Sequence, residues 1–84
     1  MDDIETILAE RQTTHGDWET HAWVTQSLKN VVTEFGDKKL TPGQKEALDM
    51  ILHKIGRIVA GNPNHEDHWI DIAGYATLEA RRLH

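Results

Sequence analysis

Apolar residues recur at helical spacing along most of the chain, and no segment alternates apolar and polar residues for long enough to predict a strand. Turn residues interrupt this spacing around positions 13–16, 36–41 and 61–64. We expect helices over residues 3–12 and 17–35, a third from Pro42 to just before Gly61, and a fourth that ends near Arg82. The sequence therefore predicts an all-α fold of four helices, in a single domain over residues 1–84.

The residues at the predicted helix ends support these boundaries. Thr41 followed by Gln44 is the pattern of a capping box at the start of the third helix. Gly36 is expected to end the second helix as a C′ residue. Asn64 with Asp67 three positions later predicts a second capping arrangement, and the short connection before it makes the last two helices an antiparallel hairpin.

The apolar stripes of the last three helices are predicted to be buried, because each covers one continuous helical face. The stripes comprise Trp18, Ala22, Leu28, Val31, Val32 and Phe35, then Leu48, Ile51, Leu52, Ile55, Ile58 and Val59, and finally Trp69, Ile72, Ala73, Ala76, Ala80 and Leu83.

The composition of the chain bears on its binding partners. A chain of 84 residues without cysteine buries a modest core and has no disulfide to stabilise it. Three tryptophans in so short a chain favour a homo-oligomer, because tryptophan is enriched at protein interfaces. Its 14 acidic and 9 basic residues give a net charge of −5, which repels a nucleic-acid backbone and disfavours such a partner.

The first residues contain neither the basic region nor the apolar run of a signal peptide. No apolar stretch approaches the length needed to span a bilayer. These features predict a cytoplasmic protein that has no membrane partner.

Opposite charges face each other across the predicted hairpin. Its register places Lys54 level with Asp71, and Arg57 level with Asp67. One interpretation is two interhelical salt bridges, which say little about function. The other is that the cations, oriented by these carboxylates, bind a phosphate group, since arginine forms bidentate hydrogen bonds with phosphate oxygens.

A second polar segment, from His15 through Gly16 and Asp17 to Trp18, lies between the first two helices. Gly16 can adopt backbone conformations that other residues avoid, and the N–H groups at the start of the next helix can bind an anion. The segment is equally compatible with a tight turn in which Asp17 caps the helix.

In the fourth helix, Gly74 predicts a close approach of the backbone to another group, and the adjacent Tyr75 either stacks on a base or packs in the core.

Carboxylates on the third and fourth helices suggest a metal site. Glu46 and Asp49 share one helical face, as do His68 and Asp71, and carboxylate oxygens suit Mg²⁺. The hairpin register offsets Asp49 from Asp71 by about 6 Å, so a solvated acidic face is the competing interpretation. We therefore expect no cofactor unless the protein is an Mg²⁺-dependent enzyme that uses Glu46, Asp49 and Asp71.

Several of these motifs together resemble a family of short phage and prophage proteins known as a domain of unknown function. The similarity extends from about Ile4 to Leu83. It rests on Arg11 with Thr14-His15-Gly16-Asp17, on Glu46-Ala47-Leu48-Asp49-Met50, on Lys54-x-x-Arg57-Ile58, and on Asp67-x-x-x-Asp71-x-x-Gly74-Tyr75-Ala76.

The chain is more distantly similar to the MazG-like all-α NTP pyrophosphohydrolases, whose metal motif would align with Glu46, Asp49, His68 and Asp71. Histidine here replaces a glutamate of that motif. The resemblance implies a small four-helix, helical-hairpin domain with a nucleotide pocket. We therefore expect a phage-type protein that binds a nucleotide-derived host immune signal in the host cytosol. The alternatives are an Mg²⁺-dependent pyrophosphohydrolase and a structural or partner-binding helical module.

Overall fold

The computed structural model describes residues 2–84, which form four α-helices and contain no strand. The helices are α1 (Asp2–His15), α2 (Trp18–Gly36), α3 (Pro42–Ala60) and α4 (Glu66–Arg82). The predicted all-α class and the four helices are confirmed. Within this range, no helix combines the length and apolar character required to cross a membrane.

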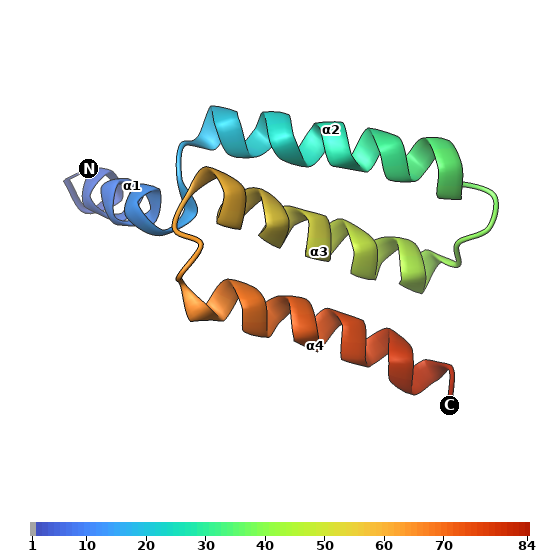
Figure 1. Cartoon of the computed structure of the whole chain (residues 1–84). Helices are drawn as coiled ribbons and strands as arrows, with labels where there is room; N and C mark the ends of the chain where they lie inside the picture. Colours follow the sequence, from blue (N-terminus) through green and yellow to red (C-terminus); the bar gives the residue numbers. More distant parts are fainter. Residues whose placement is uncertain (1) are drawn as a thin grey trace.

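The helices form an open arrangement. Figure 1 shows α2, α3 and α4 side by side with α3 in the middle, and α1 beyond the end of this three-helix layer. α3 contacts both of its neighbours, whereas the described residues of α2 and α4 do not contact each other. The radius of gyration is 14.6 Å, compared with about 12 Å for a compact chain of this length. The three-helix layer is therefore not closed into a bundle.

Local signals determine some helix ends and not others. The capping box of Thr41 and Gln44 is present with both of its hydrogen bonds, as predicted. The prediction for Gly36 is wrong: it is the last residue of α2, has no positive φ, and is followed by a helical cap residue. The predicted Asn64 cap is also wrong, because His65 occupies the N-cap position of α4 without a capping side-chain bond.

The two loops at one end of the layer cross in direct contact. Gly16, with φ +83°, ends α1 three residues later than predicted, and a Cβ there would overlap the carbonyl oxygen of Ala60. A Cβ on Gly61 would lie 2.5 Å from the carbonyl oxygen of Thr14. The backbone N–H of Asn62 donates to that same oxygen at 3.0 Å. Both glycines are needed for the crossing, which fixes the start of α2 against the end of α3.

Polar residues dominate the buried positions. α2 and α3 pack closely where Gly56 faces His21 and Thr25, since a Cβ on Gly56 would overlap the Thr25 hydroxyl and lie 2.9 Å from Nδ1 of His21. Leu52 is the one buried hydrophobic residue among positions 3–84, and the buried polar residues are His21, Thr25, Lys54 and His68.

The predicted burial of the apolar stripes is wrong for several residues of this single chain. Trp18, Val31, Phe35, Val59, Trp69 and Leu83 each keep more than half of their surface exposed. The cause lies in the arrangement, because α2 and α4 contact α3 but not each other, and no further layer covers them. A Cβ added to Gly74 would meet no atom of another element within 4 Å, so its predicted close approach is absent from the described chain.

Candidate functional site

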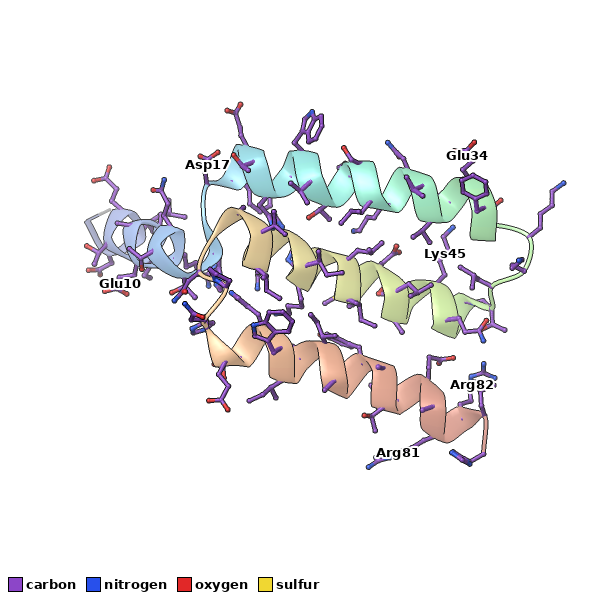
Figure 2. The ribbon with its side chains drawn as sticks, in the orientation of Figure 1. Glu10, Asp17, Glu34, Lys45, Arg81 and Arg82 are labelled. Carbon is purple, nitrogen blue, oxygen red and sulfur yellow. The ribbon has the colours of Figure 1, made fainter. Side chains whose placement is uncertain are left out.

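A cavity of about 300 Å³ lies where α1, the start of α2 and the last turns of α3 meet. The labelled Asp17 marks this junction in Figure 2. The residues that line the cavity are Leu8, Arg11, Gln12, His15, Gly16, Asp17, Trp18, His21 and Arg57. The structure thus gathers five of the residues predicted to bind a ligand, namely His15, Gly16, Asp17, Trp18 and Arg57.

Two guanidinium groups give the cavity its positive charge. Arg11 comes from α1 and Arg57 from α3, and neither forms an ion pair with a carboxylate of the described chain. Partial burial and the nearby charge of Arg11 lower the pKa of Arg57, while Asp71 and Tyr75 act in the opposite direction. Despite this shift, Arg57 remains charged at neutral pH. Two positive charges that face one cavity without an ion-paired carboxylate have the chemistry to bind an anion.

The start of α2 supplies an aromatic surface and a cap. Oδ2 of Asp17 accepts hydrogen bonds from the backbone N–H and the hydroxyl of Thr20, both at 3.0 Å, so the capping interpretation of Asp17 is confirmed. The Asp17 carboxylate would repel an anion, so the arginine side of the cavity is the more favourable side for a negative charge. Trp18 is 73 % exposed, and its ring lies 5.6 Å from the ring of the buried His21. Its indole is therefore open to a planar group.

His15 connects the cavity to a second group of histidines. Its Nδ1 lies 3.3 Å from Nε2 of His68, and that Nε2 lies 3.4 Å from the carbonyl oxygen of Thr14. With the proton of His68 on Nε2, Nδ1 of His15 is the acceptor and the proton of His15 resides on Nε2. Burial, followed by the charge of Arg57, lowers the pKa of His15 to about 4. At neutral pH His15 is therefore an uncharged hydrogen-bond donor.

We expect the fold to lose stability as the pH falls from about 6.5 to about 4. Burial, followed by the charge of Arg57, lowers the pKa of both His15 and His53 to about 4. In this pH window the unfolded chain takes up protons that the folded chain does not bind, so stability that is complete above pH 6.5 declines on acidification. Urea unfolding followed by circular dichroism should show that the free energy of unfolding falls by roughly 1–3 kcal/mol. This range already allows for solvent screening of the two partly exposed rings.

The matched control for this prediction is the double variant His15→Gln with His53→Gln. Glutamine does not titrate, so the free energy of unfolding of the double variant should change less across the same pH window. An identical pH dependence for the two proteins would assign the acid sensitivity to other groups.

The remaining predicted ligand residues do not line the cavity. Nζ of Lys54 lies 2.9 Å from Oδ2 of Asp71, which confirms that predicted pair and leaves Lys54 buried and ion-paired. The hydrogen bond from Lys54 lowers the pKa of Asp71. The predicted pair of Arg57 and Asp67 is not formed, because Asp67 lies 3.8 Å from Nε2 of His65 and Arg57 faces the cavity. Tyr75 lines a separate groove on α4.

The predicted metal ligands are not gathered into a site. The part of the chain that the structure describes has no group of three or more His, Cys, Asp or Glu side chains that could hold a metal ion. Glu46, Asp49 and Asp71 therefore form no such group, and Asp71 is engaged by Lys54. His68, which aligns with a glutamate of the hydrolase motif, is 1 % exposed and contacts His15 and Thr14.

Four cavity residues were not predicted to bind a ligand: Leu8, Arg11, Gln12 and His21. Arg11 shares a helical face with Leu8, which is the signal in the sequence that could have identified it. His21 lies one turn after Trp18, but its burial depends on the packing of α2 against Gly56. The periodicity of the sequence shows which face of α1 is apolar, but it does not show that α1 packs near the end of α3.

Comparison with protein families places the chain in one family over nearly its whole length. Residues 2–83 match the domain of unknown function DUF6378. The protein is thus an all-α domain with an arginine-lined cavity, and it belongs to the DUF6378 family. Searches of the curated proteins and of the solved structures found no match.

Proposed function

We propose that the protein binds a phosphate-bearing nucleotide, or a signal derived from one, in the cavity between α1, α2 and α3. The observation that carries this proposal is the pair of arginines, Arg11 and Arg57, which face one cavity without an ion-paired carboxylate. The phosphate group lies between the two guanidinium groups, and Nε2–H of His15 donates a further hydrogen bond. An arginine fork and a neutral donor together satisfy several oxygens of one phosphate.

The exposed indole of Trp18 supports a base-bearing ligand over a free inorganic anion. Trp18 lines the cavity, and its indole lies beside the buried ring of His21. The exposed face of the indole can therefore stack on a base. The cavity volume of about 300 Å³ is at the lower end of the range for small-molecule sites, which suits a ligand of about one nucleotide. The net charge of −5 opposes long polyanions, so the local positive charge favours a small ligand.

We further propose that the domain has a MazG-like scaffold and acts as a phage protein that sequesters a nucleotide-derived immune signal in the host cytosol. Two observations on the described side chains support binding without cleavage: they form no group of potential metal ligands, and Lys54 engages Asp71. A protein that holds its ligand intact needs a cavity and charge but no metal. Sequestration is therefore the activity that fits the site better than hydrolysis.

A nucleotide panel tests this proposal. The purified protein is incubated with nucleoside triphosphates, cyclic nucleotides and unphosphorylated nucleosides, with and without Mg²⁺, and each solution is separated by chromatography. We expect depletion of a phosphate-bearing ligand, which is recovered intact after the protein is denatured, and no depletion of the nucleosides.

Two other results would contradict sequestration. Mg²⁺-dependent turnover that is lost in Glu46→Gln would assign the protein to the pyrophosphohydrolases, because Glu46 has no part in the arginine site. The absence of both depletion and turnover would leave the partner-binding module as the remaining function.

A further inference from the structure

The two faces of the three-helix layer differ in chemistry, as positions along α3 show. Lys54 faces α4 through its ion pair with Asp71, and Gly56 faces α2 through His21 and Thr25. Ile55 follows Lys54, and Arg57 follows Gly56. Because each residue turns the helix by about 100°, Ile55 and Arg57 point to opposite sides of the layer, one on each side of the line between α4 and α2. Arg57 lies on the cavity side. Ile55 shares the other side with Leu48, Leu52 and Val59, which follow the i, i+4, i+7, i+11 spacing of a single helical stripe.

The apolar side continues across α2. His21 is buried against Gly56, so it marks the face of α2 that packs on α3. Trp18 and Val24 lie three residues before and after His21 and therefore on opposite sides of that contact. Trp18 borders the cavity, which places Val24 on the side of Ile55. The stripe on this side of α2 consists of Val24, Leu28, Val31 and Phe35.

The apolar side also continues across α4. A groove of about 320 Å³ between α3 and α4 is lined by Leu48, Ile51 and Ala76, with Gln44 and Glu79 among its polar residues. Ala76 belongs to the stripe of Trp69, Ala73 and Ala80, away from Asp71. The indole N–H of Trp69 donates to the carbonyl oxygen of Pro63 at 2.8 Å, so its ring can be covered without leaving a polar group unpaired.

The chain exposes more surface than a monomer of its mass. Its accessible area is 6303 Å², whereas a compact monomer of 9.6 kDa exposes about 5,100 Å². The excess is about 1,200 Å², and a stable dimer buries about 800 Å² of each partner. The missing burial is therefore of the size that one protein interface supplies.

We propose that the apolar face, defined by Val24, Leu28, Val31, Phe35, Leu48, Ile55, Val59, Trp69, Ala73, Ala76 and Ala80, packs against the same face of a second copy of this chain. A second copy fits because an isologous interface requires one self-complementary surface, and none of these residues is charged. Glu79, in the adjacent groove, is paired with Arg82 at 3.0 Å. The product is two three-helix layers stacked on a common core. This core replaces the hydrophobic interior that the single chain lacks.

The location of the face has a consequence for the ligand site, and this consequence rests on the proposed function. Arg57 lies on the opposite side of the layer from Ile55, so the two cavities of a dimer remain open on its outer faces. We expect one ligand for each chain. Loss of self-association should leave the affinity of a folded monomer for its ligand within about threefold of the wild-type value, because no cavity residue belongs to the apolar face.

Two matched pairs of variants test the interface. Val59→Glu (63 % exposed) and Phe35→Glu (73 %) place a charge on the apolar face, and Leu78→Glu (62 %) and Trp23→Glu (74 %) place one elsewhere at equal exposure. Light scattering coupled to size-exclusion chromatography should give the wild type and both controls about twice the mass of 9.6 kDa. The two face variants should elute at the monomer mass or bind each other at least tenfold more weakly.

The wild-type protein also permits a test that does not depend on the folding of a variant. If folding is coupled to dimer formation, its melting temperature, measured by circular dichroism, should rise with protein concentration. A monomer mass and a constant melting temperature at all concentrations would overturn the proposal and assign the face to another partner. Self-association that persists in both face variants would overturn it as well. Failure of the nucleotide panel would affect neither measurement.

Discussion

Replacing Arg57 with alanine is expected to weaken nucleotide binding roughly 100-fold while the helix content stays unchanged. Arg57 is a partly buried cation of the cavity and has no ion-paired carboxylate in the described chain, so its removal takes away the fork that we propose holds the phosphate. Each hydrogen bond to a charged group contributes about 1.5–3 kcal/mol. Isothermal titration with the ligand found in the panel measures the loss, and circular dichroism measures helicity.

Two further variants separate local geometry from net charge. Arg57→Lys retains the charge but loses the planar fork, so we expect an intermediate loss of about tenfold. Arg81→Ala removes the same charge near the end of α4, away from the cavity (Figure 2), and should leave the affinity unchanged. Equal affinities for the wild type and Arg57→Ala would remove this residue from the site and with it the main support for the proposed function.

Gly16→Ala is expected to lower the free energy of unfolding by roughly 3 kcal/mol or more. Gly16 has a φ of +83°, a conformation that costs about 1–2 kcal/mol for an L-residue with a side chain. The added methyl group would also overlap the backbone of Ala60 in the neighbouring loop. Relief of this overlap separates the two loops, so the cavity should lose its ligand in the same variant. Urea unfolding and ligand titration measure the two effects.

Gly74→Ala provides the control for this substitution. Gly74 lies within α4, and an added Cβ would meet no atom of another element within 4 Å. Alanine is favoured over glycine in a helix interior by about 1 kcal/mol, so this variant should be up to that much more stable. Similar destabilisation by both substitutions would contradict the crossing of the two loops as the reason for Gly16.

Local sequence signals fixed the helices because each signal acts within a few residues. Thr41 and Gln44 form their capping box through bonds that close within one turn, and Asp17 caps α2 in the same way. Gly36 shows the limit of such reasoning. A glycine at a helix end permits a left-handed turn without requiring it, and the next residue, Asp37, instead has helical geometry.

The hairpin register predicted one charge pair and failed on the other for a physical reason. Lys54 and Asp71 are level and face each other, so their pair forms. Arg57 is also level with Asp67 along the axis, but its side chain leaves α3 in a different direction, toward α1 and the start of α2. Axial spacing follows from the residue number, whereas the neighbour that a side chain meets depends on the packing of helices distant in sequence.

The sequence by itself determined the four helices and several of their ends, because periodicity and capping are local properties of the chain. Tertiary structure alone decided that Arg11 joins Arg57 at one cavity, that Lys54 is buried, and that much of the apolar stripes remains exposed. These outcomes depend on which helix faces share a contact. α3 contacts both neighbours, whereas the described residues of α2 and α4 do not contact each other. Which helices pack together depends on small differences in free energy between alternative packings of the whole chain.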